Sequence, residues 1–267
     1  MSNWVPLKFD LMTKRVFGDE KDTRAIKYLL KMILGIDVTN VKILNNEIIG
    51  NPYLDKKYSV DLIVEIEDKR IVVEINTNVN SKIMDRNLFY MARIMSRDIA
   101  KGEDYSKLNK HIQINFDFKG YHERPIMKYE LIDKNTGDVF SNKIEIIRID
   151  VPYFYRICYN EDASNKDKFI GLFNEEDKEK ARKLIVGNKD MEGIYEKMDE
   201  YSDDIIGLYD VEARRKFEEE SVLEEALNNK EKETTIEIAR NMLKENMDIN
   251  MISKVTGLSI DEIKNIE

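Results

Sequence analysis

The stretch YSVDLIVEIEDKRIVVEIN, residues 58–76, constrains the fold more than any other part of the chain. Its Val and Ile residues and its short period predict two β-strands joined by a turn at residues 67–69. Asp61, Glu74 and Asn76 interrupt this apolar pattern. A carboxylate buried in a strand without a partner costs several kcal/mol, so such a residue is usually paired, solvated or bound to a metal.

The strand pairing decides whether these polar side chains meet. A turn that pairs Glu67 with Arg70 would place Asp61 opposite Asn76, with Glu74 one diagonal step away. Side chains alternate along a strand, so Glu74 and Asn76 share one face. Two carboxylates this close raise each other's pKa unless a cation lies between them. The spacing therefore predicts that the polar side chains converge.

Carboxylates in this arrangement indicate a divalent-metal site. Mg²⁺ prefers one or two carboxylates together with waters and phosphate, so Asp61 and Glu74 would bind it, with the main-chain carbonyl of Ile75 as a further ligand. The corresponding chemistry is phosphodiester hydrolysis, in which the metal lowers the pKa of an attacking water and offsets charge on the phosphate. The alternative is an exposed edge-strand face, where acidic residues are common.

The flanking patterns predict an α/β core with a mixed sheet in roughly the first 155 residues. Residues 23–34 have helical spacing, with Gly35 as a stop signal. Residues 81–102 also indicate a helix, with Ser81 as N-cap. Its expected apolar face consists of Met84, Leu88, Met91 and Met95 or their close neighbours. Three further segments predict strands: HIQINFDF, IMKYELID and KIEIIRIDV. His111 opens the first of them, where a structural histidine is the default expectation.

Near residue 160 the sequence pattern changes to highly charged segments with helical spacing. We therefore expect a core domain over 1–160 and a helical region over 161–267. The region ends in two short helical patterns around Gly257, with Ser259 and Glu262 forming a capping box. This is the outline of a helix-turn-helix, which either reads DNA or serves as a small interaction or capping element.

Charge and composition narrow the protein class. Residues 1–199 hold 34 Lys and Arg against 34 Asp and Glu, so the negative excess lies in the C-terminal quarter and a phosphate partner remains compatible with the rest. No apolar run approaches the ~18 residues of a membrane helix, and the start lacks a signal pattern. We expect a cytoplasmic protein without a membrane partner. Cys158 is the only cysteine, which excludes an internal disulfide.

Several segments in the same order resemble one family. An Asp on one strand followed by Glu-x-polar on the next is similar to the motif of the PD-(D/E)xK nuclease superfamily. The surrounding sequence resembles its Rpn-type recombination-promoting nucleases, often labelled PD-(D/E)xK nuclease family transposases. Four segments carry this likeness: FDLMTKRVFGDEKDTRAIKYLLKMIL, DLIVEIEDKRIVVEIN, RNLFYMARIMSRDIAKGEDYSKLNKHIQINF and the C-terminal IARNMLKENMDINMISKVTGLSIDEI.

The resemblance implies a restriction-endonuclease-like core and a DNA endonuclease that depends on Mg²⁺ or Mn²⁺. It assigns Asp61 and Glu74 as metal ligands. The third catalytic position is a Lys in the superfamily and usually a Gln in this branch, whereas this chain has Asn76. An amide orients water or phosphate by hydrogen bonds but supplies no positive charge.

Two residues near the N-terminus match the family pattern. Asp10 corresponds to an early Asp that brings a further acid to the metal, and the alternative is a helix N-cap or surface acid. Lys14 corresponds to the Lys of an aromatic-Lys pair, with Thr13 in place of the aromatic residue. A lysine four residues after Asp10 shares its helix face, so it either reaches phosphate or pairs with Asp10.

The sequence thus leads to one hypothesis and one rival. The hypothesis is a DNA endonuclease linked to recombination, transposition or mobile-element defence, whose helical C-terminal region engages DNA or forms a homodimer. The rival is a binding module on the same fold in which Asn76 reflects lost catalysis. Arg86, Arg93 and Arg97 recur after the motif and either line a DNA-facing side or lie on a solvated face.

Overall fold

The computed structural model describes residues 4–44, 47–48, 58–79, 81–100, 102–119, 124–245 and 247–265. The chain divides into two compact units, Met1–Ile206 and Gly207–Glu267. Helix α7 (Lys189–Lys244) contributes to both. None of the described helices is both long enough and apolar enough to span a lipid bilayer.

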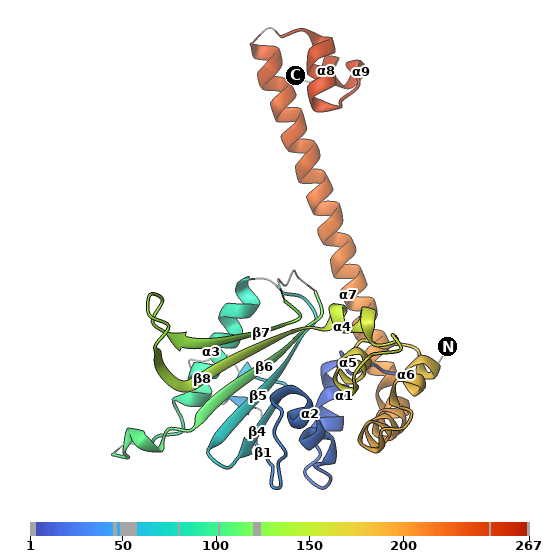
Figure 1. The fold of residues 1–267 in the computed structure, drawn as a ribbon. Helices are drawn as coiled ribbons and strands as arrows, with labels where there is room; N and C mark the ends of the chain where they lie inside the picture. The colour runs from blue at the N-terminus through green and yellow to red at the C-terminus, as the bar shows by residue number, and fades with distance from the viewer. Residues whose placement is uncertain are drawn as a thin grey trace. The chain divides into compact units, whose positions relative to one another are not determined.

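A mixed six-stranded sheet forms the centre of the first unit, as the sequence predicts (Figure 1). Its order is β1-β4-β5-β6-β8-β7. Strands β5, β6 and β8 are parallel to one another, and the remaining neighbours pair antiparallel. A separate two-stranded sheet pairs β2 with β3. The strand bounds are β1 (Lys42–Leu44), β2 (Glu47–Ile48), β3 (Tyr58–Ser59), β4 (Leu62–Ile66), β5 (Lys69–Asn76), β6 (Lys110–Asp117), β7 (Ile126–Ile132) and β8 (Val139–Asp150).

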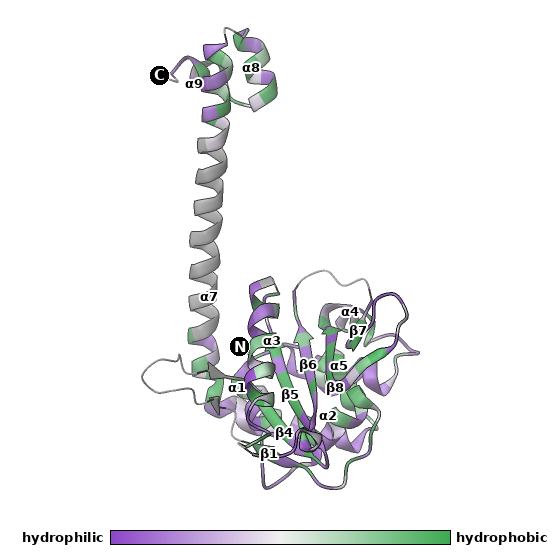
Figure 2. Ribbon diagram, turned by 90° about the vertical axis from the view of Figure 1, so that its left-hand side faces the viewer, coloured by the Kyte–Doolittle hydropathy of each residue, from purple (hydrophilic) through white to green (hydrophobic). Residues whose placement is uncertain are grey.

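Helices cover both faces of this sheet (Figure 2). Helix α3 lies on one side of the strands, and α2 and α5 lie on the other. The predicted helix over 23–34 is confirmed, because α2 ends at Leu34 with Gly35 in the left-handed conformation at φ 71°. The helix bounds are α1 (Asp10–Phe17), α2 (Arg24–Leu34), α3 (Ser81–Met95), α4 (Val151–Ile157), α5 (Asn165–Leu172), α6 (Lys178–Ile185) and a short 3₁₀ turn (Tyr105–Lys107).

The two faces of the central strand β6 differ in chemistry. Phe116 stacks on Phe173, which ends α5, with ring centroids 4.2 Å apart. The residues on the other face are Gln113, Asn115 and Asp117, which are polar and fully buried. Because side chains alternate, one face of β6 belongs to an apolar core and the other forms a buried polar layer under α3. Toward β4, Ile94 of α3 packs on an apolar cluster with Ile63 and Val72.

Helix α3 turns most of its expected apolar face inward, with Met91 buried and Met84 and Met95 half-buried, but not Leu88. The expected apolar face included Leu88, but this side chain is 53% exposed. Buried positions include Asn87, Met91 and Ile94. Asn87, the neighbour of Leu88, faces the polar layer instead, where its amide donates to Asn115.

The charged helices after residue 160 pack on the N-terminal segment, so the first unit extends to Ile206. The backbone N–H of Val5 donates to the Ser202 hydroxyl over 3.0 Å, and the Trp4 ring lies 5.0 Å from that of Tyr195. The sequence predicts a division near residue 160, where surface composition changes. The first unit continues past that point because these helices bury apolar side chains against it. Their high overall content of charged residues does not reveal these buried faces.

The second unit ends in α8 (Ile249–Thr256) and α9 (Ile260–Lys264). Gly257 between them has φ 76°, and Ser259 and Glu262 form the predicted capping box. Ile252 and Ile263 pack with Ala239 of α7 in a small apolar cluster. The predicted pair of short helices is therefore confirmed.

Candidate active site

The β4–β5 hairpin sets the position of the carboxylates, and its register differs from the prediction. The turn consists of Glu67 and Asp68, and Ile66 pairs with Lys69. The expected pairing of Glu67 with Arg70 is wrong, because Glu67 adopts a left-handed φ of 47° inside the turn. The described ladder ends with Leu62 opposite Val73.

Asp61 lies just before β4 and is held by the neighbouring strand. The backbone N–H of Ile75 donates to its Oδ2 over 2.7 Å, and the Lys14 ammonium lies 3.3 Å from Oδ1. Burial raises the pKa of Asp61, and Lys14 and the Ile75 amide offset only part of that effect. The Asp61 carboxylate is thus held in one orientation, and a nearby positive charge stabilises its ionised form.

Glu74 is a buried carboxyl group with few partners. It is only 3% exposed, although it carries a carboxyl group. Its Oε1 has no hydrogen-bond partner among the described residues, and the Arg86 guanidinium lies 3.7 Å from Oε2. Burial, followed by repulsion from Asp61, raises the pKa of Glu74 well above its usual range. An unpaired buried oxygen facing a second carboxylate is a position that a cation would stabilise.

Helix α1 brings Asp10 and Lys14 to the same place. Asp10 is its first residue and lies 3.4 Å from the Lys14 ammonium through Oδ2. Lys14 therefore pairs with both Asp10 and Asp61. Burial lowers the pKa of Lys14, but these two carboxylates outweigh it and the pKa is raised. Among the described residues no three His, Cys, Asp or Glu side chains gather closely enough to hold a metal, which leaves a pair of carboxylates.

Asn76 is brought beside Glu74 but points into the polar layer. It is 2% exposed. Its amide donates to Asp117 Oδ1 over 2.9 Å and to Asn115 Oδ1 over 3.4 Å. Its Oδ1 accepts from Asn87 over 3.1 Å and from Arg86 over 3.5 Å. Every polar atom of this side chain is thus used within the protein.

The rest of the polar layer was missed at the sequence level. Asn115 donates to the Ile147 carbonyl over 3.2 Å and accepts from Asn87 over 2.9 Å. Arg148 Nε donates to Asp117 Oδ2 over 2.9 Å. The available signal was the strand HIQINFDF itself, where every second residue is polar although the strand lies in the middle of the sheet.

The main-chain carbonyl of Ile75, the third predicted ligand, lies on the Asp61 side of β5. In a strand the N–H and C=O of one residue point to the same edge, and the N–H of Ile75 reaches Asp61. The backbone direction is therefore compatible with a ligand, and the role itself stays a prediction.

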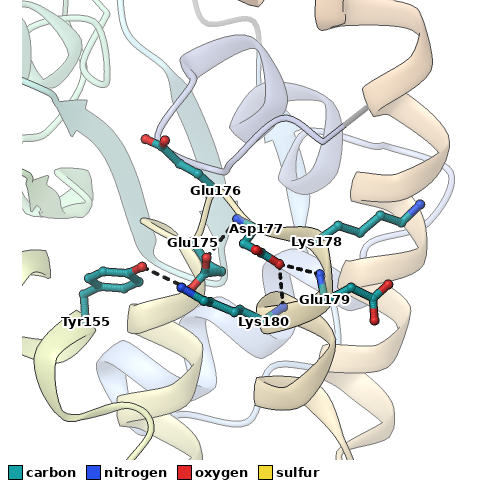
Figure 3. Close-up of a pocket in the computed structure, with 7 residues that line it drawn as sticks. All are labelled: Tyr155, Glu175, Glu176, Asp177, Lys178, Glu179 and Lys180. Carbon is teal, nitrogen blue, oxygen red and sulfur yellow. Dashed lines mark hydrogen bonds between the residues drawn. The ribbon is translucent and has the colours of Figure 1, made fainter. Parts of the chain in front are cut away.

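A separate pocket of about 470 Å³ lies between α4 and α6 and shares no residue with this site (Figure 3). Its buried member Glu175 accepts from Tyr155 over 3.2 Å, from the Asp177 N–H over 2.8 Å and from Tyr159. Burial raises the pKa of Tyr155 to about 12, so its hydroxyl stays protonated as a donor. These contacts supply hydrogen-bond donors to both carboxylate oxygens of Glu175. The main-chain carbonyl of Glu175 accepts a hydrogen bond from the Trp4 indole N–H.

Comparison with family models identifies the family of the chain. Residues 7–226 match the model described as PD-(D/E)XK nuclease family transposase. The chain belongs to this family. Residues 232–267 match the C-terminal HTH domain of the Rpn/YhgA-like nuclease family. Comparisons with curated proteins and with solved structures gave no match.

The two matches confirm the family resemblance and imply DNA as a partner. The residues present also fit a divalent metal. Asp61 and Glu74 offer the one or two carboxylates that Mg²⁺ prefers, and the buried Oε1 of Glu74 has no hydrogen-bond partner among the described residues.

Proposed function

We propose that the protein is a divalent-metal-dependent DNA endonuclease that hydrolyses phosphodiester bonds. The observation that carries this proposal is the buried Glu74, which lies beside Asp61 and whose Oε1 has no hydrogen-bond partner in the part of the chain that the structure describes. Asp61 and Glu74 would hold Mg²⁺ or Mn²⁺, with the Ile75 carbonyl as a further ligand. Bound metal would lower the pKa of an attacking water and offset charge on the phosphate.

Side-chain and backbone groups of the protein would hold the carboxylates in position before DNA binds. The Ile75 N–H fixes the orientation of Asp61, so that this carboxylate does not have to be ordered when DNA arrives. Lys14 favours the ionised form of Asp61 and, with 28% of its side chain exposed, is open to a phosphate. Asp10 anchors Lys14 from the helix start. Asn76 would act by holding the polar layer in place beneath Glu74.

We assign this activity to DNA recombination, transposition or defence against mobile elements. The C-terminal helix-turn-helix region would engage DNA or a second copy of the chain. Cutting both strands of a duplex in one encounter is easier with two sites, and a homodimer through this region would supply them.

The test is cleavage of supercoiled plasmid in EDTA, Mg²⁺ and Mn²⁺ by the wild type and by the isosteric double variant Asp61→Asn, Glu74→Gln. Metal-dependent nicking or linearisation that disappears in the variant is expected. Equal background in both proteins would favour the second candidate, a DNA-binding module that does not cut. The observation in favour of that candidate is the complete use of Asn76 inside the protein.

A further inference from the structure

The proposed nuclease reaction places negative charge on a phosphate. Asn76 has no free hydrogen-bond donor and no positive charge with which to stabilise that phosphate. Its amide hydrogens are used by Asp117 and Asn115, and an amide carries no positive charge. Stabilisation of developing charge by a fixed donor is usually a large part of catalysis. Besides the metal, a cation near Glu74 could supply such a donor.

Among the described residues two cations pair with the carboxylate ligands. Lys14 pairs with Asp61 and is also held by Asp10, so two carboxylates share its charge. Arg86 of α3 is the cation that pairs with Glu74, at 3.7 Å. It also donates to Asn76 over 3.5 Å, so it lies next to the third motif position.

Arg86 is held in one orientation but keeps free donors. Its Nε donates to Asn87 over 3.1 Å, and its guanidinium lies over the Tyr90 ring at 5.6 Å from the centroid. Nη2 faces Glu74 and Asn76, whereas Nη1 has no partner among the described residues. The Arg86 side chain is 39% exposed, against 3% for Glu74. A planar guanidinium with free N–H groups matches the oxygens of a phosphate.

We propose that Arg86 is a catalytic residue that contacts the scissile phosphate beside the Asp61–Glu74 pair. The positive charge missing from the third strand position is thereby supplied from helix α3. This role rests on the proposed nuclease function.

The test compares Arg86→Ala, Arg86→Lys and the control Lys134→Ala in single-turnover cleavage with Mn²⁺. Lys134 is an exposed cation in the β7–β8 turn, at the start of β8, whereas the site lies at the opposite ends of the parallel strands. Loss of one fixed donor predicts a cleavage rate about 100-fold lower in Arg86→Ala. We expect partial activity in Arg86→Lys, a nearly unchanged rate in Lys134→Ala, and partial rescue of Arg86→Ala by added guanidinium.

Two further readouts separate a phosphate contact from a structural role. The Mn²⁺-induced rise in melting temperature should persist in Arg86→Ala, because Asp61 and Glu74 remain. The rate deficit should also persist at high pH. A deficit that disappears at high pH would mean that Arg86 only keeps Glu74 ionised, and it would overturn the phosphate contact.

The outcomes distinguish the two proposals. Wild-type cleavage together with an equally fast Arg86→Ala variant overturns the role of Arg86 and leaves the nuclease function standing. Absence of metal-dependent cleavage by the wild type overturns both, since the role of Arg86 exists only in that reaction.

Discussion

Asn76 donates its side-chain amide to Asp117 Oδ1 across 2.9 Å, which ties the end of β5 to the end of β6. Asp117 is in turn fixed by Arg148 of β8. The short side chain of Asn76 thus completes a chain of hydrogen bonds across three parallel strands beneath the carboxylates. A longer residue would have to displace one of these partners.

The first prediction concerns Asn76→Ala. It removes one partner each from Asp117 and Asn87, both buried, so we expect unfolding free energy to fall by about 2–4 kcal/mol. Urea unfolding measures the change. The matched control is Asn135→Ala in the exposed β7–β8 turn, where a change within about 0.5 kcal/mol is expected. Equal effects at both positions would contradict a structural role for Asn76.

Much of this architecture follows from local sequence patterns. The apolar spacing of residues 23–34, the alternating strands and the Ser259–Glu262 capping box predict elements that the structure contains. These signals are local, because each depends on residues only a few positions apart. The adjacency of Asp61 and Glu74 was also predictable, because the expected register and the observed one differ by two residues along the strand and therefore keep both side chains on the same face.

What the sequence hides depends on distant partners. The register follows from the left-handed conformation of Glu67, a residue that rarely adopts it. The inward face of α3 follows from Asn115 of β6, which pairs with Asn87. The position of Arg86 follows from that same packing. None of these relationships has a periodic signature in the chain.

The second prediction concerns the metal. Mn²⁺ should raise the melting temperature of the wild type, because a ligand at 100 times its Kd adds about 2.7 kcal/mol to the stability of the folded state. Glu74→Gln should remove this response, since a neutral amide binds the cation poorly. Glu130→Gln, which changes an exposed carboxylate on β7, should retain it. An unchanged response in Glu74→Gln would exclude Glu74 as a ligand.

The third prediction concerns pH and His111. This residue is fully buried, with Nε2 3.2 Å from Asp98 and Nδ1 3.0 Å from the Asn109 carbonyl. Burial lowers its pKa, Asp98 and the Asn109 carbonyl offset part of the shift, and Arg70 and Lys143 add to it. In the unfolded chain the pKa is about 6.5, so as pH falls the unfolded state takes up the proton first.

The contribution of His111 to stability is therefore complete above about pH 6.5 and is lost as pH falls toward the folded pKa. Urea unfolding at several pH values across this window measures it. His111→Gln has no such titration, so its unfolding free energy should change less steeply below about pH 6.5 than that of the wild type. Parallel pH curves for the two proteins would show that His111 does not titrate there.

The fourth prediction compares the same substitution at two helical glycines. A Cβ added at Gly171 of α5 would lie 2.5 Å from Cys158 Cβ and 2.6 Å from its Sγ, whereas a Cβ at Gly193 of α7 meets nothing within 4 Å. Cys158 is fully buried and has no room to retreat. Gly171→Ala should therefore lower unfolding free energy by about 1–3 kcal/mol. Gly193→Ala should raise it by about 0.4–1 kcal/mol, because alanine reduces the entropy of the unfolded chain. Opposite signs in urea unfolding would establish that close packing of α5 on Cys158, and not helix propensity, requires glycine at 171; a stabilising effect at both positions would refute it.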